Sequence, residues 1–236
     1  MDSTIFCYRV LAVKSTTMAH PPAALIFDMD DTLVATFAFW LEAESKLLET
    51  IGHRWTPELA IQYKGMNALD VAATIHRLLQ PELSVKSCQE IMRNALFEAF
   101  EKSPIKPMPG AVECVRSLAA SYPLAVASGS PLPLIELAME RLELKDCFAV
   151  LVSSESVPRG KPFPDIFLAA AKILEVDPAR CLVFEDSLIG TQAARAAGMA
   201  CFTVPSSSPV EIAAIATRTF ASLRDVTAED VASVVS

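Results

Sequence analysis

Glycine is scarce in this 236-residue sequence: it has seven, and none forms a G-x-G-x-x-G or a G-x-x-x-x-G-K-[ST] pattern. The fingerprints of dinucleotide-binding and P-loop proteins are therefore missing. Lysine and arginine form no run and the formal net charge is −8, which argues against binding along nucleic-acid phosphates. No apolar run approaches the roughly 18 residues that a membrane span needs. We therefore expect neither nucleic acid nor a membrane as a partner.

Histidine and paired cysteine are also in short supply. The three histidines lie far apart along the chain, so they offer little material for a histidine metal site or a Ser-His-Asp triad. None of the six cysteines forms a C-x-x-C pair, which argues against a zinc ribbon and a redox pair. Most of the cysteines stand in apolar stretches, as small buried residues do in a reducing compartment. We therefore expect a cytoplasmic protein.

The composition is that of a globular protein, with 52% hydrophobic and 20% charged residues. Residues 1–20 fit none of the patterns that follow. Their apolar stretch Ile5–Val13 is too short to span a membrane, and no basic region of a signal peptide precedes it. An ordered flap and an extended translation start, with Met18 as the true start, both stay open. We favour a dispensable N-terminal tail.

From Ala23 onward, short apolar runs that end in polar residues recur along the chain. The runs are Ala24–Asp28, Leu124–Ser128, Val150–Ser153, Cys181–Glu185 and Ala200–Val204. Helical patterns lie between the later runs, at Pro164–Glu175 and at Ser187–Ala197, and Gly198 closes the second. Buried strands that alternate with amphipathic helices predict a doubly wound parallel sheet of the α/β class.

One long interval after the first run contains no good strand pattern. It reads instead as helices, at Phe37–Ile51 and at Asp70–Leu79. The first has Gly52 as the terminator and an expected apolar face of Phe37, Trp40, Leu41, Leu47, Leu48 and Ile51. A third helix is predicted to begin at Ser87, because Ser-Cys-Gln-Glu matches a capping box. A helical insertion after a first strand is a candidate lid. We therefore expect the following division of the chain: a tail at residues 1–20, a catalytic core at 21–35 and 106–236, and a helical cap at 36–105.

The chemistry centres on Phe27-Asp28-Met29-Asp30-Asp31-Thr32-Leu33, at the end of the first predicted strand. Alternation places Asp28 and Asp30 on the same side of an extended chain. Alone, such an acidic pair is a weak signal, because acidic residues at strand ends usually form turns.

Three later polar groups strengthen the signal: Ser128-Gly129-Ser130, Gly160-Lys161-Pro162 and Glu185-Asp186-Ser187. Each also has a structural alternative, respectively a helix cap, a solvated lysine and favourable charges at a helix N-terminus. Their conjunction at the carboxyl ends of one sheet suits a phosphoryl group and a divalent cation. Carboxylates bind Mg²⁺ through hard oxygen ligands, and a lysine with backbone N–H groups neutralises the phosphate.

In their order, these groups resemble the four motifs of the haloacid dehalogenase superfamily: D-x-D-x-T at Asp28–Thr32, S at Ser128, K at Lys161 and E-D at Glu185-Asp186. The resemblance runs from about residue 23 to residue 205. The sequences around the motifs are similar to the β-phosphoglucomutase-like branch, particularly its hexitol and 2-deoxyglucose phosphate phosphatases. This resemblance implies a Rossmann-like core with an inserted helical cap, and Mg²⁺-dependent hydrolysis of a small phosphorylated metabolite, a sugar or polyol phosphate.

The resemblance also implies roles for the acidic residues. Asp28 is the nucleophile that forms an aspartyl-phosphate, and Asp30 is the general acid and base. Mg²⁺ is held by Asp28, the Asp30 carbonyl and Asp186. Glu185 supports the metal from behind its direct ligands or through water.

Substrate contacts follow from the same resemblance. Ser128, Gly129 and Ser130 are expected at the substrate's phosphoryl group, together with Lys161. In the cap, Lys64-Gly65-Met66-Asn67 is similar to the loop that selects the substrate. We expect Lys64, Gly65 and Trp40 to contact its organic part, although a plain interhelical turn fits the loop equally well.

Two positions depart from the relatives' pattern, and two alternatives stay open. Asp31 stands where relatives often have glycine, and Phe37 replaces a glutamate common in the branch. A phosphomutase of the branch usually has an arginine after the glycine of the cap loop, and Met66-Asn67-Ala68 has none, which favours a phosphatase. An inactive scaffold that acts as an interaction protein is disfavoured because every motif position is filled. We expect a monomer or a weak homodimer.

Overall fold

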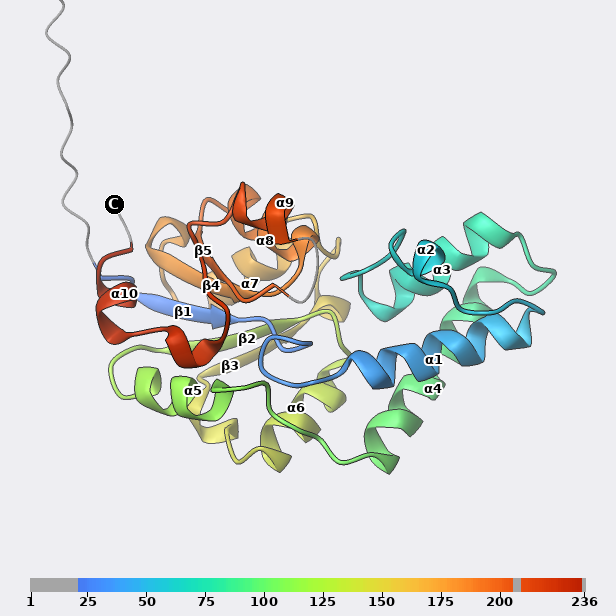
Figure 1. Cartoon of the computed structure of the whole chain (residues 1–236), viewed down its shortest axis with the longest axis horizontal. Helices are drawn as coiled ribbons and strands as arrows, with labels where there is room; N and C mark the ends of the chain where they lie inside the picture. The colour runs from blue at the N-terminus through green and yellow to red at the C-terminus, as the bar shows by residue number, and fades with distance from the viewer. Residues whose placement is uncertain (1–20, 206–208, 235–236) are drawn as a thin grey trace, which may run out of the picture.

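A parallel six-stranded sheet forms the centre of the computed structural model, which describes residues 21–205 and 209–234. The predicted tail at residues 1–20 lies outside the described residues. The strands are β1 (Ala24–Phe27), β2 (Leu124–Ser128), β3 (Val150–Ser153), β4 (Cys181–Glu185), β5 (Ala200–Thr203) and β6 (Arg218–Thr219). Their order is β3-β2-β1-β4-β5-β6, and every neighbouring pair is parallel. The predicted doubly wound, Rossmann-like α/β fold is confirmed (Figure 1).

Alternate residues of the strands divide the core into two layers, because successive side chains of a strand point to opposite faces. Leu25 and Phe27 of β1 pack with α5 (Ala111–Ala119) and α6 (Leu132–Arg141). Ala24 and Ile26 pack on the other face with α7 (Asp165–Ile173) and α8 (Leu188–Ala196). The shorter elements are η1 (Lys145–Cys147), η2 (Ser154–Ser156), η3 (Pro178–Arg180), α9 (Pro209–Ala213), η4 (Leu223–Asp225) and α10 (Ala228–Ala232).

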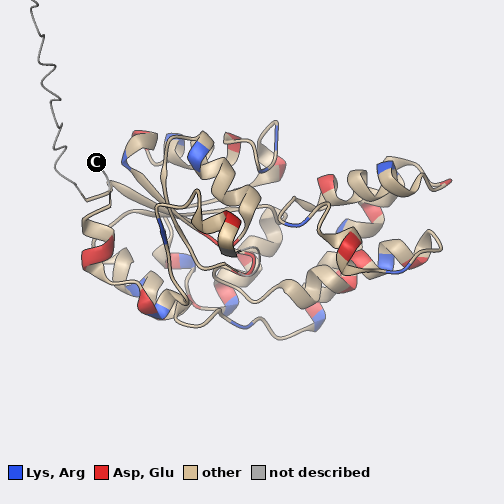
Figure 2. Ribbon diagram, turned by 45° about the horizontal axis from the view of Figure 1, so that its top comes forward, with Lys and Arg blue, Asp and Glu red and all other residues tan. Residues whose placement is uncertain are grey.

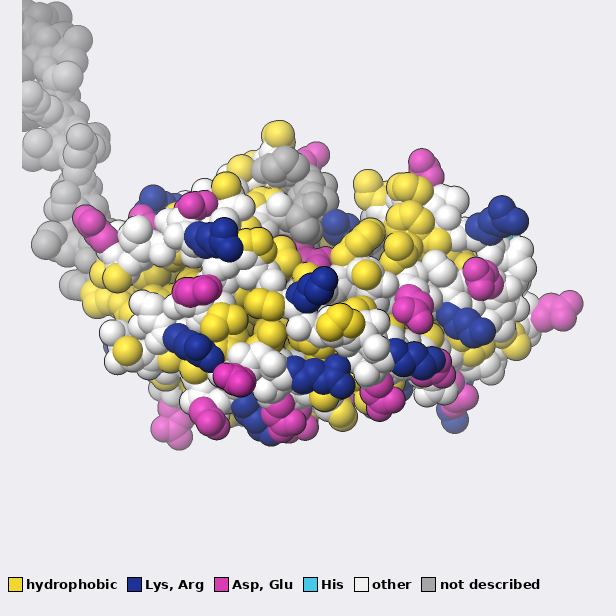
Figure 3. All heavy atoms as spheres, turned by 60° about the horizontal axis from the view of Figure 1, so that its bottom comes forward, with side chains coloured by type: hydrophobic (Ala, Val, Ile, Leu, Met, Phe, Trp, Pro, Cys, Tyr) yellow, Lys and Arg dark blue, Asp and Glu magenta, His cyan; other side chains and the backbone are white. Residues whose placement is uncertain are grey.

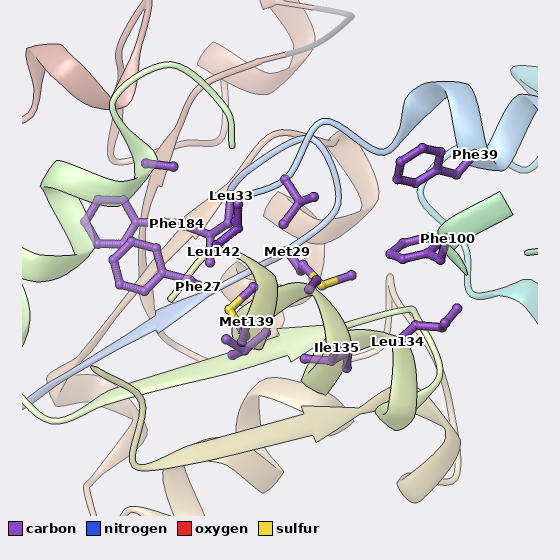
Figure 4. Close-up of a cluster of buried hydrophobic side chains, with 14 of the residues drawn as sticks. Phe27, Met29, Leu33, Phe39, Phe100, Leu134, Ile135, Met139, Leu142 and Phe184 are labelled. Atoms are coloured by element: carbon purple, nitrogen blue, oxygen red, sulfur yellow. The ribbon is translucent and has the colours of Figure 1, made fainter. Parts of the chain in front are cut away.

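An aromatic stack joins β1 to β4 at the centre of the sheet. The rings of Phe27 and Phe184 lie parallel with centroids 4.3 Å apart (Figure 4). The chain reverses its strand order here, with β2 on one side of β1 and β4 on the other. In open α/β sheets the carboxyl ends of strands at such a reversal form the crevice that receives ligands. Asp28 follows β1 and Asp186 follows β4, so the fold places both at that crevice.

The helices of the insertion lie together beyond the carboxyl end of β1 (Figure 1). They are α1 (Phe37–Thr50), α2 (Pro57–Ala60), α3 (Ala68–Leu79) and α4 (Val85–Lys102). Helix α4 packs against both α1 and α3, and the rings of Phe39 and Phe100 meet at a centroid distance of 4.8 Å (Figure 4). Their apolar side chains belong to the same buried cluster as α5 and α6, so the helical insertion and the sheet share a core.

Two local predictions about these helices are wrong. Helix α4 begins before Ser87, with Ser84 as its N-cap, and the Ser84 hydroxyl accepts from the backbone N–H of Ser87 at 3.1 Å. The predicted apolar face of α1 includes Phe37, yet that side chain is 54% exposed. The buried face contains Phe39 and Ala43 together with the expected Leu47 and Leu48. A second face of α1, one that includes Phe37, lines a cavity.

Charged side chains are distributed over the helices on both sides of the sheet (Figure 2). On the face shown in Figure 3, basic and acidic side chains stand interspersed among small apolar areas. Within residues 21–205 and 209–234, no helix has the length and apolar character that crossing a membrane requires.

Candidate active site

Lys161 joins the ends of β1 and β4 through two buried ion pairs. Its Nζ lies 2.6 Å from Oδ1 of Asp28 and 2.6 Å from Oε1 of Glu185. Burial alone would lower the pKa of Lys161, but the two carboxylates outweigh burial and raise it. The lysine is therefore held in its charged form at the sheet's crevice.

The start of α8 fixes the carboxylate of Glu185. Its Oε2 accepts from the backbone N–H of Asp186 and of Ser187, both at 2.8 Å, and from the Ser187 hydroxyl at 2.9 Å. Gly190, in the first turn of α8, leaves room for this arrangement, because a Cβ at that position would lie 1.7 Å from Oε1. Glu185 thus has partners on both oxygens, a geometry suited to supporting neighbouring groups.

Three buried carboxylates form the candidate metal centre. Asp28, Glu185 and Asp186 each offer an oxygen, and these atoms lie within 4.8 Å of one another. Burial raises the pKa of Asp28 to about 8, and the charge of Lys161 opposes the rise. One ammonium does not balance three carboxylates, and the donor atoms are all hard oxygens. The residues therefore fit a small divalent cation such as Mg²⁺.

Asp30 is held by three donors from two parts of the chain. Trp40 Nε1 of α1 donates to Oδ1 at 2.9 Å, and the Ser128 hydroxyl donates to Oδ2 at 2.7 Å. The Ser130 hydroxyl also reaches Oδ2, at 3.0 Å. The two serines were expected at the phosphoryl group and Trp40 at the organic part of the substrate. In this structure all three bond to Asp30, and so they orient that carboxylate.

The structure gives a reason for aspartate at position 31, where relatives often have glycine. The φ of Asp31, 57°, lies in the left-handed region, which short polar residues tolerate better than most side chains do. Its Oδ1 accepts from the backbone N–H of Thr36 at 3.0 Å and of Phe37 at 3.1 Å. The Thr36 side chain makes no capping bond of its own. Asp31 therefore caps α1 and fixes that helix to the loop that carries Asp28 and Asp30.

A cavity lies between the carboxyl ends of the strands and the helical insertion. Its core side includes Asp28, Asp30, Asp31, Gly129, Lys161, Asp186 and Ser187, and its other side includes Phe37, Trp40, Leu41, Glu44, Trp55, Ala60, Tyr63, Lys64, Gly65, Met66 and Val71. The structure thus brings the cap residues Lys64, Gly65 and Trp40 to the same cavity as Asp28. Ser128 and Ser130 stand behind Asp30, fully buried, and do not line it.

Glu44 is a cavity residue that sequence reasoning missed. It lies on α1, and its Oε2 accepts from Trp55 Nε1 at 2.7 Å and from the Tyr63 hydroxyl at 3.4 Å. Burial raises the pKa of Glu44 to about 7, against the effect of these two bonds and of the Lys64 charge. One feature of the sequence could have identified it: Glu44 follows Trp40 by one helical turn and so lies on the same side of α1.

The raised pKa of Glu44 predicts a pH-dependent cost in stability. A pKa of about 7 instead of 4.5 means that the folded chain binds the Glu44 proton more tightly than the unfolded chain does. The protonated carboxyl therefore adds to the unfolding free energy below pH 4.5, and this addition is lost as pH rises to about 7. Glu44→Gln keeps an acceptor for Trp55 but does not titrate. Between pH 5 and pH 8 we expect its unfolding free energy to gain about 2–3 kcal/mol relative to wild type, measured by urea denaturation. A difference independent of pH would contradict the raised pKa.

Comparisons with known proteins agree with this geometry. A model of haloacid dehalogenase-like hydrolases matches residues 22–198. The chain is 34% identical over 181 residues to fructose-1-phosphate phosphatase YqaB of Escherichia coli, a match that covers 75% of this chain and 93% of that protein. It is 36% identical over 194 residues to the bifunctional riboflavin kinase/FMN phosphatase of Arabidopsis thaliana, covering 81% of this chain. The chain spans about half, 51%, of the Arabidopsis protein's length.

A solved structure is also similar to this chain. CbbY from Rhodobacter sphaeroides, in complex with phosphate, aligns with a TM-score of 0.74 and 26% identity, over 86% of this chain and 96% of that chain. Every residue of the site described above falls inside the matched region, residues 22–198. On these grounds the chain belongs to the haloacid dehalogenase-like hydrolase family.

Proposed function

We propose that this hydrolase is a phosphatase acting on small phosphorylated metabolites, sugar or polyol phosphates, through an aspartyl-phosphate on Asp28. The observation that carries the proposal is the buried Asp28 carboxylate, paired with Lys161 and facing a cavity roofed by the helical insertion. The relatives named as fructose-1-phosphate and FMN phosphatases support the reaction class.

Asp28 performs the first displacement by attacking phosphorus in line with the leaving oxygen, which divides one hard step into two easier ones. Lys161 holds the carboxylate in place and offsets the negative charge that gathers as the phosphoryl group approaches. Together with the Gly129 N–H, it is proposed to contact the phosphoryl oxygens, while the Ser128 hydroxyl acts behind them through its bond to Asp30.

Asp30 moves the protons. It donates a proton to the leaving oxygen of the substrate and then takes one from the water that hydrolyses the aspartyl-phosphate. The bonds from Trp40, Ser128 and Ser130 hold its carboxylate in a fixed orientation, which is what a positioned acid and base requires.

We propose Mg²⁺ as the cofactor, held by Asp28, Asp186 and the backbone carbonyl of Asp30, with Glu185 as support. The fit rests on three buried carboxylates opposed by one lysine. When bound, the metal supplies the positive charge that allows the carboxylate nucleophile and the phosphate, both anions, to meet.

The remaining parts of the proposal concern the cap and the setting. Residues 36–105 form a cap that closes the site, and Lys64 and Gly65 contact the organic part of the substrate. Four buried cysteines carry no disulfide among the described residues, which supports a reducing compartment, the cytoplasm. We propose a monomer or a weak homodimer.

Asp28→Asn should abolish turnover while the fold stays intact, because the amide is close in shape to the carboxylate but is a poor nucleophile. Released phosphate from p-nitrophenyl phosphate measures the activity, and circular dichroism measures the fold. The matched control is Asp146→Asn, an exposed aspartate. Retention of more than a trace of activity in Asp28→Asn would remove Asp28 as the nucleophile.

Asp30→Asn should allow slow phosphorylation of Asp28 by a substrate with a good leaving group, and should then trap the aspartyl-phosphate because water has lost its base. Rapid mixing with p-nitrophenyl phosphate should show a burst of p-nitrophenol with a size near one per protein molecule. Steady turnover at the wild-type rate would show that another group moves the protons.

Magnesium should be required for activity and should raise the melting temperature of the wild-type protein by mass action. Asp186→Ala should raise the Mg²⁺ concentration for half-maximal activity, and it should reduce the thermal shift. Calcium should inhibit, because its looser and higher coordination positions Asp28 poorly for attack. Equal activity with both ions would contradict this metal centre.

A further inference from the structure

Among the described residues that line the cavity, Glu44 is the one buried acid to which the proposed chemistry gives no task. The side chain is 9% exposed and lines the same cavity as Asp28 and Lys161. Burying a carboxylate costs free energy unless hydrogen bonds replace its lost hydration. An apolar residue at this position of α1 would avoid that cost. A carboxylate in a cavity wall is therefore best explained by a polar ligand group.

The bonds that Glu44 makes leave half of its carboxylate open to such a group. Trp55 and Tyr63 both donate to Oε2, at 2.7 Å and 3.4 Å. For Oε1, the described part of the chain supplies no hydrogen-bond donor. Trp55 and Tyr63 therefore fix the orientation of the carboxylate, and Oε1 can accept a hydrogen bond from a molecule in the cavity.

The other walls of the cavity decide which kind of donor fits. Aromatic walls with a carboxylate suit either the hydroxyls of a polyol or an organic cation. Lys64 lines the same cavity and its charge acts on Glu44. A second cation beside this lysine would be repelled, whereas hydroxyls can accept from the lysine and donate to the carboxylate. The cavity therefore favours hydroxyl groups.

Helix α1 places Glu44 one turn from the residue that bonds to Asp30. Trp40 and Glu44 are four residues apart, which is a rise of about 6 Å between their Cα atoms along the helix. Asp30 is the proposed proton donor to the ester oxygen, and the bonds of Glu44 go to Trp55 and Tyr63 instead of Asp30. We therefore expect the hydroxyl that Glu44 binds to lie away from the ester oxygen.

We propose that Glu44 is a specificity-determining residue that accepts, through Oε1, a hydrogen bond from a hydroxyl of a phosphorylated polyol or sugar, away from the phosphate. This assignment rests on the proposed phosphatase function and names the substrate class of that same site.

Phosphate release by wild type and Glu44→Gln tests the proposal with acetyl phosphate, glycerol 3-phosphate and sorbitol 6-phosphate. Glutamine keeps an acceptor for Trp55 and Tyr63 but presents an amide N–H₂ where Oε1 stands. We expect kcat/KM for sorbitol 6-phosphate to fall about 10- to 100-fold further than for acetyl phosphate, mainly through KM, as for one lost charge-assisted bond. The loss with glycerol 3-phosphate, which carries fewer hydroxyls than sorbitol 6-phosphate, should lie between the other two. Glu49→Gln, an exposed glutamate of the same helix, is the control.

Several outcomes would overturn the assignment. Equal losses for all three substrates would reduce Glu44 to a support of the cavity wall, and equal activities would remove it from the site. A selective loss with O-phosphoethanolamine, and none with sorbitol 6-phosphate, would make it a cation site.

Calorimetry separates a failure of this assignment from a failure of the proposed function. If wild type hydrolyses none of the phosphates, the proposed function fails. Sorbitol 6-phosphate that still binds wild type more tightly than Glu44→Gln would then support the Glu44 contact by itself. No binding to wild type would overturn it.

Discussion

The ammonium of Lys161 is the charge on which the arrangement of the site depends. Without it, Asp28 and Glu185 would be two buried carboxylates at the ends of adjacent strands, each raising the free energy of the other's charged form. The lysine comes from the loop before α7, so it connects both halves of the doubly wound sheet. Glu185 also accepts hydrogen bonds from backbone N–H groups at the start of α8. Gly190, which has no side chain, leaves the space that the Glu185 carboxylate occupies. The fold thereby keeps an excess of negative charge at its crevice.

The sequence predicts the sheet side of this site well, and the reason is topological. Parallel strands converge at their carboxyl ends, so Asp28, Ser128 and Glu185 are brought together by any fold that follows the apolar runs. Strand alternation is enough to find these positions. The chemistry of the residue types then narrows the ligand to a phosphate and a cation, before any distance is known.

The helical side was less predictable, because its contacts depend on how helices pack and not on where they begin. The bond from Trp40 to Asp30 requires α1 to start at a defined angle, and the unforeseen cap formed by Asp31 sets that start. Helix α1 has two apolar faces, one against α4 and one against the cavity. The sequence pattern shows only that apolar residues recur, so it does not tell these two faces apart. Glu44 was missed for this reason. Ser84 and Ser87 are both good caps, so local sequence alone did not choose between them.

The spacing of Trp40 and Glu44 on α1 bears on how relatives of this chain can diverge. The first position touches the residue proposed to move protons, so a substitution there disturbs every substrate alike. The second is one turn away, and its carboxylate bonds to Trp55 and Tyr63 instead of Asp30. A single replacement at Glu44 can therefore alter which metabolite is accepted while the catalytic machinery is inherited intact. Because these two tasks lie one helical turn apart, the substrate preference of such an enzyme can change through the substitution of one residue.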